Sequence, residues 1–231
     1  IAEYNMAEKI TFHVMGEPFM HPRFFEILDH AAQLGVKTGI TTNGTYLDEE
    51  MAIKLEKVTA SQVNISLQTP DEESFKTRKS RKMKFEEYHN RILKFIEGCL
   101  KQEKPPKIKV HFLNTSIKTE VPGDDWTVGT MSVINNTKDL RKTFRYWAGE
   151  VHKICPPLNE EKRLEVEKNI EKLSAFKWNV VEVAPNIYFE TYILNTWGNA
   201  FAEGSKVVPS KTGYCSALND HFAILCNGDL T

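Results

Sequence analysis

Short apolar segments alternate with amphipathic segments along the first half of the chain. The apolar segments have the length of strands, and the amphipathic segments repeat their hydrophobic residues at helical spacing. The expected strands are residues 9–16, 36–44, 62–69 and 107–114, and the expected helices are residues 21–35, 48–58 and 83–100. Because strands and helices that alternate at this spacing form right-handed crossover units, we expect an α/β fold with a parallel sheet, open or closed into a barrel.

The second half of the chain has a less regular pattern. Clusters of Gly, Pro and Asn in residues 115–157 predict a lid or an insertion rather than another strand–helix unit. A helix is expected over residues 159–176, followed by strands over residues 178–184 and 186–195. The pattern leaves open whether these last two strands pair as a hairpin.

The strand expected over residues 62–69 has one polar face. Along it, polar and apolar residues alternate as Asn64, Ser66 and Gln68 against Val63, Ile65 and Leu67. A strand in a tightly packed parallel barrel is apolar on both faces. The alternation therefore predicts either a barrel interior that holds something polar, or an edge strand with one face in water.

Composition and charge narrow the class of protein. The chain has 231 residues, of which 41% are hydrophobic and 26% charged, as in ordinary globular proteins. A net charge of −1 provides no field that would attract nucleic acid or an anionic membrane surface. Since the sequence contains neither a signal peptide nor an apolar run of membrane-spanning length, we expect a cytoplasmic protein with no membrane partner.

Three polar motifs follow three of the expected strands. They are MGEP at residues 15–18, TTNG at 41–44 and SLQT at 66–69. Parallel α/β proteins bind ligands at the carboxyl ends of their strands, where such motifs would converge. Each motif alone is also an ordinary turn signal, but together they predict a ligand site at one end of the sheet.

Residues 10–47, which contain the first two motifs, closely resemble the second and third strand–helix units of the radical S-adenosylmethionine (SAM) enzymes. In that family a strand ends in G-G-E-P or a near variant, His-Pro opens the next helix, and the following strand ends in T-N-G. Here Met15 replaces the first glycine. Residues 64–88 look like the fourth-strand segment of the same family. The resemblance is good over residues 9–116 and looser to about residue 199.

The resemblance implies a partial (β/α)6 TIM-like barrel that binds SAM. Gly16, Glu17 and Pro18 would hold the methionine amino group, with the Glu17 carboxylate attracting the ammonium. Ser66 and Gln68 would meet the ribose hydroxyls. Thr42 and Asn43 would line the adjacent edge of the site, and Arg78 or Arg81 would pair with the SAM carboxylate. Arg78 and Arg81 also fit a solvated basic turn within residues 76–84.

Such enzymes hold a [4Fe-4S] cluster, generate a 5'-deoxyadenosyl radical and abstract a hydrogen atom from a substrate. Their cluster is bound by a C-x3-C-x2-C loop after the first strand, and the 231 residues contain no such triplet. We therefore expect an N-terminally truncated fragment whose cluster ligands lie upstream of Ile1, and which cannot assemble the cluster alone. No residue is identifiable as a general acid or base.

Residues 213–231 resemble the entrance to the SPASM extension of radical SAM peptide-modifying enzymes. Cys215 matches the first cysteine of that pattern, and Asn227-Gly228 matches its turn. The resemblance implies a domain over residues 1–199, the start of an extension over residues 200–231 with an auxiliary iron–sulfur cluster, and a peptide or protein substrate. Cys99, Cys155 and Cys226 read as structural thiols.

Two other functions fit the same expected fold. One is an iron-free parallel barrel that binds a small metabolite at the carboxyl ends of its strands, and the other is a cluster-less scaffold or binding module. A zinc site is not expected, because His13, His21 and His111 lie on separate elements without paired spacing.

Overall fold

The structure is a computed structural model that describes residues 7–13, 16–78, 83–115, 127–128 and 131–194. The main sheet consists of β1 (Lys9–Phe12), β2 (Lys37–Thr42), β3 (Gln62–Ser66), β4 (Lys107–Thr115), β7 (Val180–Ala184) and β8 (Ile187–Leu194). A small second sheet pairs β5 (Thr127–Val128) with β6 (Met131–Ser132). The α-helices are α1 (Phe24–Gln33), α2 (Glu49–Lys57), α3 (Glu72–Phe75), α4 (Phe85–Leu100), α5 (Thr137–Ile154) and α6 (Glu160–Glu171), and two 3-10 turns are η1 (Pro18–Met20) and η2 (Lys76–Arg78).

The six strands are arranged in the order β1-β2-β3-β4-β8-β7. The first five in this order are parallel, and β7 pairs antiparallel with β8 at the edge of the sheet. The expectation of an α/β fold with a parallel sheet is therefore confirmed, with one antiparallel strand added. The hairpin that the sequence left open is present, and Asn186 at its turn has a positive φ of 64°. Closure into a barrel stays a prediction.

Side-chain caps explain where three of the helices begin. Asp48, Asn136 and Asn159 each accept a hydrogen bond at 2.8 Å from the backbone N–H three residues further on. These caps satisfy N–H groups that the first turn of a helix leaves without partners. The described helices include none with the length and apolarity that a bilayer crossing requires.

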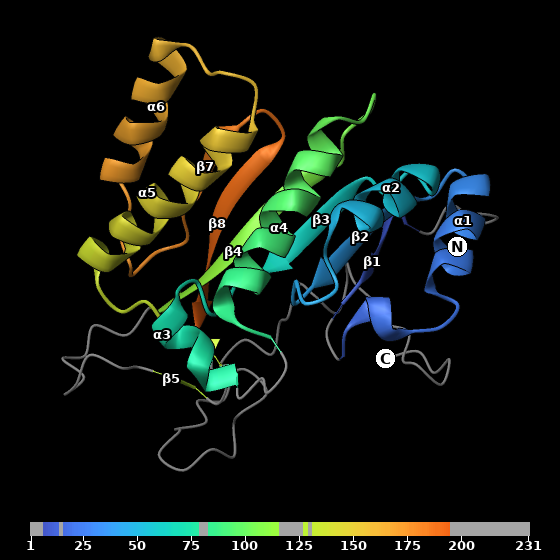
Figure 1. Ribbon diagram of the computed structural model, residues 1–231, viewed down its shortest axis with the longest axis horizontal. Helices are drawn as coiled ribbons and strands as arrows, with labels where there is room; N and C mark the ends of the chain where they lie inside the picture. Colours follow the sequence, from blue (N-terminus) through green and yellow to red (C-terminus); the bar gives the residue numbers. More distant parts are fainter. Residues whose placement is uncertain (1–6, 14–15, 79–82, 116–126, 129–130, 195–231) are drawn as a thin grey trace, which may run out of the picture. The chain divides into compact units, whose positions relative to one another are not determined.

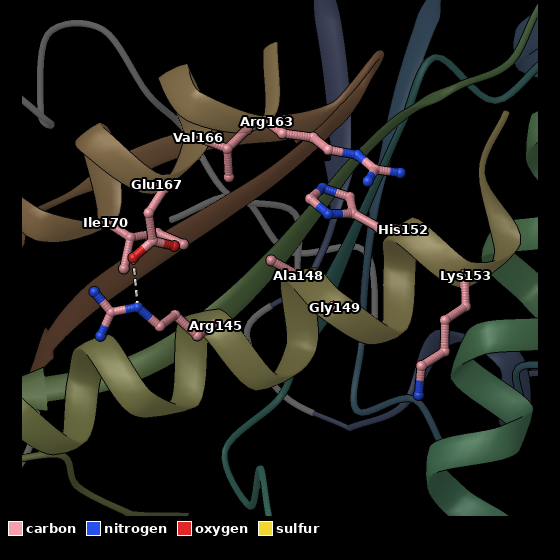
Figure 2. A pocket seen from close by; sticks show the side chains of 9 residues that line it. All are labelled: Arg145, Ala148, Gly149, His152, Lys153, Arg163, Val166, Glu167 and Ile170. Carbon is pink, nitrogen blue, oxygen red and sulfur yellow. Dashed lines mark hydrogen bonds and ion pairs between the residues drawn. The ribbon is translucent and has the colours of Figure 1, made fainter. Parts of the chain in front are cut away.

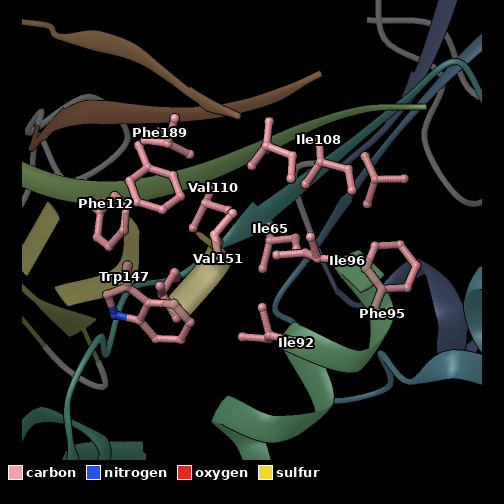
Figure 3. Close-up of a cluster of buried hydrophobic side chains, with 14 of the residues drawn as sticks. Ile65, Ile92, Phe95, Ile96, Ile108, Val110, Phe112, Trp147, Val151 and Phe189 are labelled. Atoms are coloured by element: carbon pink, nitrogen blue, oxygen red, sulfur yellow. The ribbon is translucent and has the colours of Figure 1, made fainter. Parts of the chain in front are cut away.

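The hydrophobic core lies on one face of the sheet. Ile40, Val63, Ile108 and Ile187 form a row across four neighbouring strands, in direct register and almost completely buried. Helices α2, α4 and α5 lie over this face (Figure 1). Ile92 of α4 and Trp147 of α5 point toward the strand side chains in Figure 3, and both are fully buried. The opposite face carries the polar positions of the strands, and we call it the polar face.

The structure corrects the expectation that residues 115–157 form a lid or insertion. Residues 137–154 form the 18-residue helix α5, and Phe144, Trp147 and Val151 on it are fully buried in the core. Helix α5 therefore belongs to the layer that covers the sheet. Residues 116–126 and 129–130 lie outside the described residues.

Two glycines within helices give a matched test of the helix packing. A Cβ added at Gly98 of α4 would lie 2.8 Å from Cβ of Ala52 on α2, whereas a Cβ added at Gly149 of α5 would have no atom within 4 Å. Gly98→Ala should therefore lower the free energy of unfolding by about 1–3 kcal/mol through overpacking. Gly149→Ala should raise it by about 0.5–1 kcal/mol, because alanine favours the helix. Urea unfolding measures both, and equal stability of the two variants would contradict the close approach of α2 and α4.

Candidate functional site

The carboxyl ends of β1, β2 and β3 lie next to one another. Parallel pairing brings Phe12 beside Ile40, and Thr42 beside Ile65, in neighbouring strands. The loops that follow these three strands contain the motifs that the sequence predicted to converge. Within the described residues, the three motifs therefore lie together at the carboxyl ends of the parallel strands.

Glu17 ties the loop after β1 to the end of β2. Its Oε1 accepts a hydrogen bond of 2.8 Å from the Thr42 hydroxyl, and its Oε2 accepts one of 2.7 Å from the Asn43 backbone N–H. Both carboxylate oxygens thus have protein donors, which the sequence did not indicate. The preceding Gly16 has a positive φ of 87°, and no atom of the described residues other than Gly16 and its chain neighbours lies within 4 Å of the position that its Cβ would occupy. The backbone at Gly16 is therefore open to a ligand.

Asn43 and Gly44 form a tight turn at the end of β2. The Asn43 Oδ1 accepts hydrogen bonds from the backbone N–H of Thr45, at 2.9 Å, and from its hydroxyl, at 2.6 Å. Gly44 has a φ of 83°, and an added Cβ would lie 3.1 Å from the Tyr88 hydroxyl. A side chain at position 44 would therefore be strained by its backbone conformation and crowded by Tyr88.

Arg78 contacts the same turn from the other side. Its Nε donates to the Thr69 hydroxyl at 2.6 Å, its Nη2 to the Tyr88 hydroxyl at 3.1 Å and its Nη1 to the Asn43 carbonyl at 3.4 Å. The guanidinium also lies over the Tyr88 ring, 4.6 Å from its centroid. All three guanidinium nitrogens of Arg78 therefore contact a protein acceptor, which supports a role in positioning the turn at Asn43. Arg81 lies outside the described residues.

Tyr88 was not predicted as a site residue, since the sequence placed it only within the helix expected over residues 83–100. It is fully buried, and its hydroxyl donates a 2.8 Å hydrogen bond to the Asn43 carbonyl. Burial raises the pKa of Tyr88 to about 12, against the opposing effect of the Arg78 guanidinium. The phenol therefore stays protonated and keeps its donor on the turn. Tyr88 is the last residue of the segment 64–88 that resembles the family, but the resemblance implied no role for it.

Ser66 and Gln68 follow at the end of β3. The backbone N–H of Gln68 donates to the Ser66 carbonyl at 3.0 Å, and Ser132 N–H donates to the Gln68 carbonyl at 2.8 Å. Both side chains are partly buried, and neither has a hydrogen-bond partner in the part of the chain that the structure describes. Their polar groups are therefore available to a ligand.

The cysteines of the described residues do not fit an iron–sulfur cluster. Burial raises the pKa of the Cys99 thiol to about 12 and that of Cys155 to about 11, so neither forms a thiolate readily. No group of three or more His, Cys, Asp or Glu side chains in the described ranges is arranged to hold a metal ion. Cys215 and Cys226 lie outside those ranges.

A charged cluster lies on the polar face of β4 and β8. The Lys109 ammonium is 2.8 Å from Glu190 Oε2, His111 Nε2 is 3.6 Å from the same oxygen, and Trp178 Nε1 donates to Glu190 Oε1 at 3.0 Å. From the sequence, His111 was weighed only as a metal ligand. Lys109 and His111 are two residues apart in β4, so their side chains lie on the same face of the strand. This spacing was the signal in the sequence that could have predicted the cluster.

The cluster predicts a pH-dependent contribution to stability. Burial alone would raise the pKa of Glu190, but His111 and Lys109 outweigh it and lower that pKa from 4.5 to about 2. Because the folded-state pKa is depressed, the stabilisation is present above pH 4.5 and is lost as the pH falls toward 2. Glu190→Gln should therefore be less stable than wild type at neutral pH, with the difference shrinking at acidic pH. Urea unfolding across this range checks it, and a pH-independent difference would contradict the pairing.

A separate cavity of about 440 Å³ lies between α5 and α6. It is lined by Arg145, Ala148, Gly149, His152, Lys153, Arg163, Val166, Glu167 and Ile170. Arg145 pairs with Glu167 at one end, and Arg163 and His152 lie at the other (Figure 2). None of the residues predicted for the site lines this cavity.

Comparisons with known proteins agree with the strand-end motifs. Residues 1–114 match the family described as the radical SAM superfamily. A tungsten-containing aldehyde ferredoxin oxidoreductase cofactor-modifying protein of Pyrococcus furiosus is 38% identical over 58 residues, which are 25% of this chain and 16% of that protein. An Fe-coproporphyrin III synthase of Methanosarcina barkeri is 44% identical over 52 residues, 22% of this chain and 13% of that protein. The matches thus span only a small part of these relatives.

Solved structures show weaker similarity. Streptococcus suis SuiB has a TM-score of 0.43 at 17% identity, with 96% of this chain and 48% of that chain covered. TYW1 with a lysine-pyruvate adduct bound has a TM-score of 0.41 at 16% identity, with 76% of this chain and 53% of that chain covered. Similarity at this level does not define a function. The radical SAM family match covers residues 1–114, just under half of the chain, and this segment contains the motifs at the ends of β1, β2 and β3.

Proposed function

We propose that the chain is the core of a radical SAM enzyme that binds SAM at the carboxyl ends of β1, β2 and β3. The observation that carries the proposal is the convergence of Gly16, Thr42, Asn43 and Ser66 at one edge of the sheet, on loops that hydrogen bonds hold together. Parallel α/β sheets bind ligands at the carboxyl ends of their strands. The open backbone at Gly16 and the Ser66 hydroxyl, which has no partner in the described ranges, support it further.

The residues of this edge divide into two roles in the proposal. Ser66 and Gln68, whose side chains have no hydrogen-bond partner among the described residues, offer polar groups to the ribose hydroxyls, and the backbone next to Gly16 has room for the methionine end of SAM. Glu17 and Arg78 already bond to protein groups, so we assign them to holding the turn at Asn43 in place. Pro18 begins η1 directly after Glu17 and restricts the same loop.

SAM bound beside a reduced iron–sulfur cluster supplies the chemistry of hydrogen-atom abstraction. The described residues provide no cluster ligands, so the proposal places the cysteines that bind the cluster upstream of Ile1. It also includes closure of the sheet into a partial barrel, an extension of SPASM type from residue 200 with Cys215 as a cluster ligand, and a peptide or protein substrate. These parts depend on the sequence resemblance.

SAM binding to the 231-residue chain tests the proposed site. Ser66→Ala should weaken binding about five- to tenfold, the loss expected for one hydrogen bond. Ser61→Ala is the matched control, because Ser61 lies before the amino end of the same strand and donates to the Thr38 carbonyl. Equilibrium dialysis with labelled SAM measures both. Equal affinity of the two variants would remove Ser66 from the site, and no binding by the wild-type chain would argue against the site as a whole.

A longer chain that includes an upstream C-x3-C-x2-C segment tests the enzyme activity. After anaerobic reconstitution with iron and sulfide, it should become coloured and release 5'-deoxyadenosine from SAM. A colourless protein that binds a small metabolite instead would favour the iron-free barrel. Without such an upstream segment in the gene, the cluster-less alternatives would be preferred.

A further inference from the structure

The cavity between α5 and α6 follows from the residues on the facing sides of the two helices. Arg163, Val166 and Ile170 recur at spacings of three and four residues, so they lie on one side of α6. Opposite them, Ala148 and Gly149 occupy the middle of the lining side of α5. Because neither has a side chain larger than a methyl group, the helices leave a space of about 440 Å³. Sites for small molecules usually have volumes of about 300–1,000 Å³.

Gly149 enlarges this space although the packing of α5 does not require glycine. Apart from its chain neighbours and the backbone of its own helix, no described atom lies within 4 Å of the position that its Cβ would occupy. Its φ is not positive, so the backbone does not require glycine either. Glycine inside a helix is less stable than alanine. The room at Gly149 is therefore available to a ligand and has no other use in the described residues.

The cavity has an apolar floor with a cationic group at one end. Val166 and Ile170 form the floor, and only 3% and 1% of their surfaces are exposed. Figure 2 shows the Arg163 guanidinium beside the His152 ring at one end of this floor. Since Arg163 precedes Ile170 by seven residues, the two lie about 10 Å apart along the helix. The space suits an elongated ligand with one polar end.

His152 is held in place at this end by β7. Its Nε2 lies 2.8 Å from the Val183 carbonyl oxygen. A carbonyl oxygen only accepts hydrogen bonds, so Nε2 carries a proton and donates it to Val183. The fixed imidazole therefore forms a wall of the cavity beside Arg163.

Arg163 is the Lys or Arg residue of the cavity lining that has no partner in the described ranges. Arg145 pairs with Glu167 at 2.6 Å, and Lys153 pairs with Glu150 at 2.5 Å. One unpaired guanidinium balances one negative charge, and its planar shape matches a carboxylate. A phosphate monoester, with a charge of about −1.5 to −2, would need a second free cation. The charges of the lining therefore favour a monocarboxylate.

We propose that the cavity between α5 and α6 binds a small monocarboxylate with an apolar body. The carboxylate pairs with the Arg163 guanidinium, and the apolar body lies on Val166 and Ile170 in the space next to Gly149. This binding site shares no residue with the proposed SAM site and does not depend on it.

Titration with 4-phenylbutyrate tests the class of ligand. In the 231-residue chain with carbon-13-labelled isoleucine methyl groups, the signal of Ile170 should shift and saturate, and Ile170→Val assigns that signal. The neutral 4-phenylbutyramide should bind about five- to tenfold more weakly, the loss expected for one charged contact. Inorganic phosphate should not displace 4-phenylbutyrate. The absence of a saturable shift, equal affinity for the amide, or displacement by phosphate would each overturn the proposal.

Two variants of α6 test the role of Arg163. Arg163→Gln and Lys168→Gln each remove one positive charge from the helix, but Lys168 is exposed and does not line the cavity. Arg163→Gln should weaken the binding of 4-phenylbutyrate about five- to tenfold and leave that of the amide unchanged. Lys168→Gln should bind both as wild type does. Equal losses in the two variants would mean that net charge alone attracts the probe, which would overturn the contact with Arg163.

Two variants of α5 test the location. Gly149→Leu fills the space and keeps every charged residue of the lining, so it should abolish the shift of Ile170. Lys142→Leu is the matched control, because Lys142 is exposed on the same helix and does not line the cavity. It should bind 4-phenylbutyrate with wild-type affinity, and urea unfolding shows that both variants are folded. Unchanged affinity in a folded Gly149→Leu variant would overturn the assignment of the ligand to this cavity.

Discussion

Replacing Trp147 by alanine should lower the free energy of unfolding by about 3–5 kcal/mol, the usual cost of removing a large aromatic side chain from a core. Trp147 is fully buried on α5, its ring lies 4.7 Å from the His89 ring, and its Nε1 donates a 2.9 Å hydrogen bond to the Pro70 carbonyl. Alanine would leave a cavity and also a buried carbonyl without its donor. Since globular proteins are stable by about 5–15 kcal/mol, the loss approaches the whole margin. Urea unfolding followed by far-UV circular dichroism measures it.

Trp178 provides the matched control for this prediction. It is 60% exposed, so Trp178→Ala removes an indole that is mostly in water, together with its hydrogen bond to Glu190. Its expected cost is about 1 kcal/mol, close to that of one hydrogen bond. Trp147→Phe should fall between the two alanine variants because it keeps an aromatic ring. Equal costs for the two alanine variants would mean that α5 does not cover the sheet as described.

Trp147 also shows where the sequence pattern failed. Residues 115–157 begin with Gly, Pro and Asn clusters, and these led us to expect a lid. The helical part starts only after Asn136, and its apolar residues recur at helical spacing among charged ones. This amphipathic pattern was present in the sequence, but the Gly, Pro and Asn clusters before it dominated the prediction. Burial of Phe144 and Trp147 depends on the sheet beneath them. Contacts between a helix and strands that are far apart in the sequence cannot be recognised from local periodicity.

The strands were easier to predict than the roles of the residues that follow them. The alternation over residues 62–69 correctly separated the buried Val63 and Ile65 from the polar Asn64. Asn64 does not lie in an edge strand, since β3 pairs on both sides, and its amide donates a 3.0 Å hydrogen bond to the Thr41 hydroxyl. Of the two readings of the polar face, the edge strand is therefore wrong, and a polar face within the sheet is confirmed.

The side-chain partners of Glu17 and Arg78 could not be predicted from residue type. A carboxylate suggested an ammonium ligand, and a guanidinium suggested a carboxylate ligand. Both conclusions assumed free side chains. In the structure the backbone N–H of Asn43 and its carbonyl supply the partners instead. Backbone groups at a strand end are present in every sequence, so no residue pattern announces them.

Glu17 offers the test with the largest expected effect on ligand binding. Glu17→Ala removes the acceptors of the Thr42 hydroxyl and of the Asn43 N–H, each bonded to a charged group. Such a bond contributes about 1.5–3 kcal/mol, so the turn at Asn43 should lose its fixed conformation and SAM should bind at least about tenfold more weakly. Equilibrium dialysis with labelled SAM gives the affinity, and the folded state of the variant is checked by urea unfolding.

Glu17→Gln separates the two possible roles of the carboxylate. Its amide oxygen can still accept from the Asn43 N–H, and its NH2 group can donate to the Thr42 hydroxyl, which already accepts from the Gly44 N–H at 3.1 Å. If Glu17 holds the turn, glutamine should cost about threefold or less in affinity, far less than alanine. If the carboxylate instead binds the SAM ammonium through its charge, glutamine should be nearly as damaging as alanine, and wild-type binding should weaken as salt is added. Similar losses in both variants would therefore return Glu17 to direct contact with the ligand, and a large difference between them would establish it as the residue that shapes the site.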